Sequence, residues 1–465
     1  MTQHTGDGSM ERALSKHIAT VGRDGLSPAV TMSARRELVW CIGTAIAGAN
    51  APGSEAIRDF ATESGGRPES TIWGFGDRAP AHMAGLANAT YAKAHEYEDK
   101  IWIGNTHGYG VGMAVVPAAL AVAERKGGVK GDELLTAIAV ATDVQARLLA
   151  APVDAIFGNS GWNSAYLFSV FGATAAAAKI LELDAAATQN AMGLAYAQAA
   201  GNYQGQIEGV LGVRLQLGFA VRNGIMAADL AARGITGVQQ FLTGRYALYP
   251  LYFGDQEVDL ESVTAGLGTD YRGERLGFKG YPCGLVAHPA IDALRTLAGS
   301  YAPEDVVAVR VLGDDHMRIM TEPRDVRKNP RNFIDAQFSI PWALACVIVD
   351  GTVKLQHFET PALADKRYRS LAQAVEVTLE EDRGSSRVEL DLRDGRTLRS
   401  IDVKVAHGHP DNPLSNAEIG DVFRDCLAFG PNSQAVPKAA RLPELVFGGE
   451  SIPDADDLMA MLRPT

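Results

Sequence analysis

Ionisable side chains of several types are concentrated in one short stretch of the chain, residues 95–110. The stretch reads H-E-Y-E-D-K-I-W-I-G-N-T-H-G-Y-G and lies between two alanine-rich segments. If it forms a helix, His95 and Asp99 lie one turn apart, as do Glu96 and Lys100. Carboxylates and an imidazole held by rigid helices are suited to acid–base catalysis. The alternative is a solvated helix end on which these charges only pair with one another.

His107, near the end of this stretch, lies in a different setting. Gly104, Gly108 and Gly110 interrupt regular structure around it, so we expect His107 on a loop at the end of a helix. A histidine changes charge near neutral pH and can take up and return a proton there. His107 is therefore the first candidate for the acid/base group.

Length and charge limit the classes of partner. The chain has 465 residues, 46% hydrophobic and 21% charged, which indicates a globular protein of about two to three domains. The formal net charge of −12 argues against nucleic acid, and no polybasic patch would bind a membrane surface. No apolar run is long enough to span a bilayer, and the polar first ten or so residues resemble a disordered leader without a signal core. A small anionic substrate stays compatible with this charge, because a local pocket can be positive on an acidic protein.

The cysteines indicate a reducing compartment. Cys41, Cys283, Cys346 and Cys426 are far apart in sequence and form no C-x-x-C pair, which argues against a disulfide framework or a zinc site. We therefore expect a cytoplasmic protein with no metal. Cys283 is expected to be a small buried side chain rather than a nucleophile, since no base is placed beside it by the sequence.

Hydrophobic periodicity divides the chain into three segments. Residues 1–275 are helical, with a helix over 28–50 and many alanines that let helices approach closely. Residues 276–406 form a separate α+β unit, in which two alternating runs flank Asp394-Gly395 and predict a β-hairpin. Residues 407–465 are helical again, and we expect them to pack back on the first domain.

Common cofactor motifs are absent from the sequence, and a family resemblance is present. There is no Walker A loop, no G-x-S-x-G, no H-E-x-x-H and no G-x-G-x-x-G between a strand and a helix. Four passages in order resemble the MmgE/PrpD family, which includes 2-methylcitrate dehydratase, cis-aconitate decarboxylase and iminodisuccinate epimerase. They are A-H-E-Y-E-D with His107 and V-V-P-A-A-L-A-V-A-E; G-W-N-S with F-G-A-T-A-A-A-A-K-I-L; R-L-Q-L-G-F-A-V-R-N-G; and F-K-G-Y-P-C with H-P-A-I-D-A and A-Q-F-S-I-P-W-A-L-A.

The resemblance implies a fold, an oligomeric state, a cofactor requirement and a class of substrate. The fold would be mostly α: a large all-helical domain and a smaller α+β lid domain inserted before a C-terminal helical return. Such proteins are typically homodimers with the active site between helical domain and lid. They need neither a metal nor an organic cofactor, and they act on small-molecule carboxylates.

The family's site residues carry over to several positions of this chain. Its acidic D-x-D-D cluster appears as Glu96-Tyr97-Glu98-Asp99, and the histidine after it matches His107, followed here by glycine in place of proline. The lysine before the Y-P-C motif matches Lys279, and the later histidine matches His288. Tyr281 belongs to the same motif and is a candidate substrate contact.

Two positions depart from the family pattern. A frequent histidine of the family is Asn163 here, and a frequent lysine is Val213, followed by Arg214 as a candidate substrate contact. Asparagine can hydrogen-bond but cannot shuttle a proton near neutral pH. Either the substrate carries less charge than 2-methylcitrate or cis-aconitate, or other residues substitute, or the reaction itself has changed.

The resemblance and the residues together predict a lyase. A base, His107, removes a proton next to a carboxylate, while donors and cations stabilise the developing oxyanion and a general acid assists loss of water. Lys279 and His288 would bind carboxylate or complete a proton relay, and Glu96 and Asp99 would orient the imidazole or bind a hydroxyl. Asn163 would be a neutral substrate contact.

Water elimination is the leading reaction, followed by epimerisation or isomerisation and then decarboxylation, because all can share a carbanion-like intermediate. The alternative of another class is a binding or scaffold relative whose catalytic site is impaired by the two lost cationic positions.

Overall fold

The chain folds into two compact units. The computed structural model describes residues 8–103, 107–152, 161–431 and 436–463. The helical unit comprises the described residues of Met1–Ala94, Glu98–Leu276 and Ser415–Thr465, and the α+β unit comprises His95–Tyr97 and Gly277–Leu414. The predicted fold class, mostly α with a smaller α+β domain and a C-terminal helical return, is confirmed.

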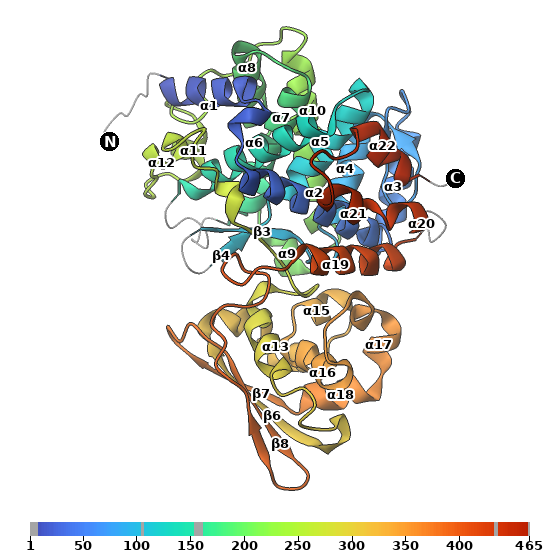
Figure 1. Ribbon diagram of the computed structural model, residues 1–465. Coiled ribbons are helices and arrows are strands. Elements are labelled where there is room, and N and C mark those ends of the chain that lie inside the picture. Colours follow the sequence, from blue (N-terminus) through green and yellow to red (C-terminus); the bar gives the residue numbers. More distant parts are fainter. Residues whose placement is uncertain (1–7, 104–106, 153–160, 432–435, 464–465) are drawn as a thin grey trace. The chain divides into compact units, whose positions relative to one another are not determined.

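Long, alanine-rich helices form the helical unit, with α7 at its centre (Figure 1). Helices α5, α6 and α10 pack against α7, and the C-terminal α19 packs back on α2. The helices are α1 Ser9–Thr20, α2 Pro28–Gly48, α3 Ser54–Glu63, α4 Ala81–Ala92, α5 Gly112–Lys126, α6 Gly131–Ala150, α7 Ser164–Ile180, α8 Ala185–Tyr196, α9 Gln204–Glu208, α10 Gly212–Ala231, α11 Leu248–Tyr252, α12 Glu261–Thr264, α19 Asn416–Phe429, α20 Val436–Ala439, α21 Leu442–Phe447 and α22 Ala455–Met461. Two short hairpins complete the unit: β1 Ser70–Thr71 with β2 Arg78–Ala79, and β3 Asp99–Ile103 with β4 His107–Tyr109.

Helix α2 shows how the sequence sets its bounds. Ser27 caps the N-terminus, with its hydroxyl accepting a hydrogen bond from the Val30 amide at 3.2 Å, and Pro28 occupies the first turn where its missing N–H costs nothing. The helix ends at Gly48, where a Cβ would overlap the Tyr91 carbonyl oxygen of α4. The prediction that small residues allow closely packed helices is confirmed at this contact.

The α+β unit is built on a four-stranded sheet of order β7-β6-β8-β9. Strand β7 is parallel to β6, whereas β8 is antiparallel to both β6 and β9. The β8–β9 pair turns at Asp394-Gly395, as the sequence predicts. Strand β5 Leu276–Phe278 spans the residue at which the two units divide. The other elements are α13 His288–Arg295, β6 Val306–Asp314, α14 Arg324–Lys328, α15 Phe333–Gln337, α16 Ile340–Asp350, α17 Thr360–Ala364, α18 Lys366–Gln373, β7 Val375–Glu380, β8 Arg387–Leu392 and β9 Thr397–Arg399.

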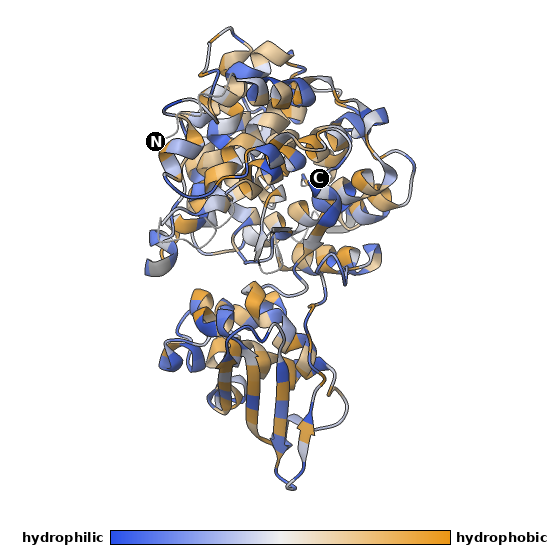
Figure 2. Cartoon of the chain, turned by 90° about the vertical axis from the view of Figure 1, so that its left-hand side faces the viewer, coloured by the Kyte–Doolittle hydropathy of each residue, from blue (hydrophilic) through white to orange (hydrophobic). Residues whose placement is uncertain are grey.

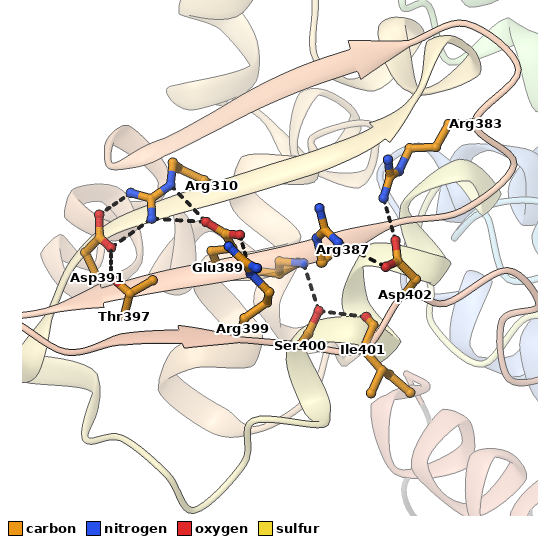
Figure 3. A network of polar contacts seen from close by, with 11 residues as sticks. Arg310, Arg383, Arg387, Glu389, Asp391, Thr397, Arg399, Ser400, Ile401 and Asp402 are labelled. Atoms are coloured by element: carbon orange, nitrogen blue, oxygen red, sulfur yellow. Dashed lines mark hydrogen bonds and ion pairs between the residues drawn. The ribbon is translucent and has the colours of Figure 1, made fainter.

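The two faces of this sheet differ in polarity. Hydrophobic and hydrophilic residues alternate along the strands (Figure 2), and the apolar side chains form a core with α13, α16 and α18. The other face carries charges: Arg310 of β6 binds both Glu389 and Asp391 of β8, and Arg399 donates to Glu389 at 2.7 Å (Figure 3). Exposed ion pairs add little stability, so the apolar face holds the sheet together.

Two further properties bear on the sequence-based expectations. All four cysteines are buried and none forms a disulfide. Over the described ranges, we find no helix with the length and apolarity needed to cross a bilayer.

Replacing Gly48 by alanine tests the close approach of α2 and α4. The added Cβ would meet a backbone oxygen, which cannot move aside as a side chain can, so we expect Gly48→Ala to lower the free energy of unfolding by about 3 kcal/mol. Gly212→Ala in α10 is the matched control, because no heavy atom lies within 4 Å of its added Cβ. Urea unfolding should show a change below about 1 kcal/mol for this control. Equal effects of the two substitutions would contradict the packing argument.

Candidate functional site

The acidic stretch after α4 forms a turn and a hairpin rather than a helix. Helix α4 ends at Ala92, Glu96 has a left-handed backbone with φ of 51°, and strand β3 begins at Asp99. The helix considered for residues 95–100 therefore does not form, and the i,i+4 spacing of its charges has no meaning here. Lys100 instead pairs with Glu98, at 2.7 Å between its Nζ and Oε1.

His107 is the first residue of strand β4 and pairs with Ile103 of β3. The expected loop at a helix end is thus replaced by a strand. The side chain of His107 lies outside the part of the chain that the structure describes, so its proposed role as acid/base group stays a prediction.

Asp99 fixes the base of this hairpin. Its Oδ2 accepts hydrogen bonds from the backbone N–H groups of Val111 and Gly112, at 3.2 and 3.0 Å. These two amides mark the start of α5, immediately after β4. One carboxylate therefore connects the first residue of β3 to the segment that follows β4, and it satisfies free amides at a helix N-terminus.

A second carboxyl group, which the motifs did not indicate, lies next to Asp99. Glu37 of α2 accepts a hydrogen bond from the Thr142 hydroxyl at 2.7 Å. A Cβ built on Gly112 would lie 2.6 Å from Glu37 Oε1 and 3.1 Å from Asp99 Oδ1, so both oxygens border the same small space. In the sequence, Glu37 follows Arg35 and Arg36 and precedes the apolar second half of α2, a pattern that gives no sign of a buried carboxyl group.

Burial controls the protonation of this pair. Burial raises the pKa of Asp99 to about 6, although the two backbone amides favour its charged form. Burial and the charge of Asp99 raise the pKa of Glu37 well above its usual range. Both shifts favour the uncharged forms, so the two carboxyl groups at the base of the hairpin titrate as an interacting pair.

The other candidates of the helical unit serve local structure. Asn163 is the N-cap of α7, and its side-chain oxygen accepts from the Tyr166 amide at 3.4 Å. Arg214, in the first turn of α10, donates to the Pro52 carbonyl oxygen, and burial lowers the pKa of its guanidinium to about 10. Its Nη1 has no hydrogen-bond partner among the described residues.

In the α+β unit, Lys279 and Glu96 form a buried ion pair. The Lys279 ammonium donates to the backbone oxygen of Glu96 at 2.7 Å and to its Oε2 at 3.2 Å. The structure thus brings together two residues that are far apart in sequence and that the motifs predicted separately. Burial raises the pKa of the neighbouring Cys283 to about 12, despite the opposing effect of Lys279, which agrees with the expected unreactive thiol.

Tyr281 and His288 lie against each other in the same unit, with ring centroids 5.1 Å apart. The Tyr281 hydroxyl donates to Asp292 at 2.5 Å and accepts from Arg295 at 2.7 Å, and burial raises the pKa of Tyr281. His288 is fully buried at the first position of α13. The Asp292–Arg295 pair, which the sequence did not single out, therefore sets the orientation of the tyrosine.

The candidate residues of the helical unit and those of the α+β unit can provide different kinds of chemistry. The helical unit supplies a buried pair of carboxyl groups beneath a histidine-bearing hairpin, and the α+β unit supplies a buried ammonium, a phenol and an imidazole. Proton transfer and stabilisation of an oxyanion both need groups of these types. The described residues contain no cluster of three or more His, Cys, Asp and Glu side chains suited to a metal ion.

Comparison with known proteins gives matches over both units. Models of the MmgE/PrpD N-terminal and C-terminal domains match residues 12–261 and 281–441. The cis-aconitate decarboxylase-like protein oryM of Aspergillus oryzae is 26% identical over 491 residues, covering 99% of both chains. A cis-aconitate decarboxylase of Aspergillus terreus is 23% identical, covering 100% of this chain and 98% of its own. The human cis-aconitate decarboxylase is 25% identical over 76% of this chain and 74% of its own.

The raised pKa of Asp99 predicts a pH dependence of stability. The folded state binds a proton at Asp99 more tightly than the unfolded state does. The stabilisation that this protonation gives the folded state is therefore fully present below about pH 4 and is lost as the pH rises to about 6. The loss should amount to about 3 kcal/mol or less. We expect Asp99→Asn to flatten this part of the curve of unfolding free energy against pH, measured with urea.

The exposed Asp59→Asn variant is the control and should keep the wild-type slope. A second variant, Asp99→Ala, leaves two buried amides without their acceptor and should be destabilised by about 2–4 kcal/mol at pH 7. An unchanged slope in Asp99→Asn would show that this carboxyl group does not titrate as inferred.

Proposed function

Because the chain belongs to the MmgE/PrpD family, as its motifs predict, we propose that it is a lyase that acts on a small carboxylic acid through a carbanion next to a carboxylate. The observation that carries this proposal is the match, over 98% or more of both lengths, to two fungal proteins whose names include cis-aconitate decarboxylase. The buried acid pair and the buried lysine support it, since both kinds of group are needed to move a proton and stabilise negative charge.

In the dehydration that we place first, His107 takes the proton from the carbon next to a carboxylate. The electron pair left behind is delocalised onto the carboxylate oxygens, where donors such as Lys279 and His288 would stabilise it. A general acid then protonates the hydroxyl group on the neighbouring carbon, which leaves as water while the double bond forms. Asp99 acts as a positioning residue, because it fixes the hairpin whose strand β4 begins at His107.

Decarboxylation is the second candidate, and the printed names of the relatives favour it. In this case the carbon–carbon bond to one carboxylate breaks, carbon dioxide leaves, and the resulting carbanion takes a proton from the same acid/base group. Both reactions pass through a carbanion-like intermediate, so the products must distinguish them.

Proton NMR in D2O is the direct test of this proposal. We expect purified protein, with a metal chelator present, to convert at least one member of a panel of hydroxy- and unsaturated carboxylic acids. His107→Ala should lower the rate by about a hundredfold or more, because general acid–base catalysis contributes factors of this size. A new alkene from a hydroxy acid means dehydration, released carbon dioxide means decarboxylation, and an exchanged but unchanged skeleton means epimerisation.

His316→Ala is the matched control, since this histidine is exposed in the α+β unit and should leave the rate unchanged. If no acid reacts or exchanges a proton, the lyase proposal fails and a binding or scaffold role becomes the better account. Loss of activity on chelation would contradict the proposed independence from metal.

We also propose that the protein is a homodimer. Helix α10 exposes Phe219, Met226 and Leu230, which lie on one face at 40%, 39% and 39% exposure. A second copy would remove these side chains from water. Light scattering after size exclusion should give twice the chain mass for wild type and a monomer for Met226→Glu with Leu230→Glu. Phe60→Glu, at an exposed position of α3, should stay dimeric, and a monomeric wild type would refute the proposal.

A further inference from the structure

Strand β7 lies at an edge of the four-stranded sheet and pairs with β6 only (Figure 1). The Val309 N–H donates to the Ala374 carbonyl oxygen at 3.1 Å, so the even-numbered residues of β7 are those whose backbone groups bind β6. Backbone groups of successive residues point to opposite sides of a strand, so the N–H and C=O groups of Val377 and Leu379 point away from the sheet. These four groups have no hydrogen-bond partner among the described residues. An unpaired strand edge of this kind is a template for a further strand.

A hollow of about 300 Å³ lies along this edge. Residues 375–379 of β7 line one part of it, and Arg318, Arg324 and Lys328 are among the residues of the segment 318–328 that line the other. All of these residues belong to the α+β unit. Because the hollow is bordered by β7 and by the segment 318–328, it suits a single extended segment better than the whole edge of another sheet.

The pleat of β7 determines which side chains an added strand needs. Val377 and Leu379 are half-buried against the apolar core of the unit, whereas Glu376 and Thr378 are exposed on the other face. In antiparallel pairing, residues directly opposite each other lie on the same face of the sheet. The added segment therefore needs apolar side chains opposite Val377 and Leu379 and polar ones opposite Glu376 and Thr378.

Charge distinguishes the two polar positions. Lys328 and Arg324 already pair with Glu376, at 2.5 and 3.7 Å, and a second acid directly opposite Glu376 would be repelled. An uncharged polar residue is therefore favoured at that position. Thr378 carries no charge, and the lining of the hollow has three cations against two acids. An acidic residue is consequently favoured opposite Thr378.

We propose that the outer edge of β7 is a docking site for an extended segment of a partner protein, which adds an antiparallel strand to the sheet. Read from its N-terminus, the segment has the pattern apolar, acidic, apolar, uncharged polar, apolar, and its central residue lies opposite Val377. Main-chain hydrogen bonds supply affinity in this mode of recognition, and the alternating side chains supply specificity. The docking site does not depend on the reaction that the protein catalyses.

A five-residue peptide tests the proposal directly. The peptide V-E-V-T-V, blocked at both ends and labelled with fluorescein through a glycine spacer, should bind the full chain saturably in fluorescence anisotropy, with a Kd of about 100 µM or lower. N-methylation of its central valine removes the N–H that donates to Val377 and should weaken binding about tenfold. N-methylation of its glutamate is the matched control, because that N–H points away from β7, and binding should change by less than about twofold.

Substitutions at Thr378 test the polar position. Thr378→Glu places a carboxylate opposite the acid of the peptide and should weaken binding about threefold, whereas Thr378→Lys should strengthen it by a similar factor. Thr360→Glu, at an exposed position of α17 in the same unit, makes the same change of charge and should bind the peptide as wild type does. Equal effects of Thr378→Glu and Thr360→Glu would overturn the proposed register.

Hydrogen exchange gives a readout at single amides of the wild-type chain. The amides of Val377 and Leu379 should exchange faster than those of Glu376 and Thr378, which donate to β6. Peptide binding should slow the first two and leave the second two unchanged.

Three results would overturn the proposal. The first is the absence of saturable binding, which would mean that the charged side chains along β7 only guard the edge. The second is an equal effect of the two N-methylations. The third is an assembly of wild type larger than a dimer in light scattering that Thr378→Glu dissolves, because a second copy of β7 would then occupy the edge.

Discussion

Close packing of small residues in the helical unit is the constraint on which the rest of the structure depends. At Gly48 of α2, Gly218 of α10 and Gly224 of α10, an added Cβ would collide with the backbone of a neighbouring helix. Helices that approach this closely exclude water from the space between them, so any polar group there must be satisfied by the protein itself. Glu37 and Asp99 lie in such surroundings, each 1% exposed. Their raised pKa values are thus a direct result of how the helices pack.

The same constraint links packing to the candidate chemistry. Asp99 can be buried only because two backbone amides at the start of α5 bind its carboxylate, and these amides follow the strand that begins at His107. Glu37 lies beside it and accepts a hydrogen bond from the Thr142 hydroxyl. The position of the hairpin is therefore tied to α2, α5 and α6 together. A group that must transfer protons benefits from such a rigid support, because small displacements are costly for catalysis.

The features that could be predicted from the sequence are those set by interactions between residues close together in the chain. Helix α2 and the β8–β9 hairpin were predicted well, because caps, periodicity and turn residues act over a few positions. The stretch 95–100 was not, since its charges fit a helix and only its contacts with distant residues make it a turn and a strand. For the same reason, Glu37 carried almost no signal: an acid next to two arginines looks like part of a solvated face until Asp99 and Thr142 are placed beside it. The family motifs named Glu96 and Lys279 separately, but the ion pair between them required the structure.

Each unit compensates its buried charge internally, and the two do so by opposite means. In the helical unit, two acids lie together, and burial raises the pKa of both, which favours their uncharged forms. In the α+β unit, a base and an acid lie together and cancel each other. A group that is already compensated attracts an added ion less strongly than a bare charge does, so hydrogen bonds to substrate gain importance relative to net attraction. Hydrogen bonds depend on direction more than total charge does, and discrimination would then rest on the shape of the acid and the placement of its carboxylates.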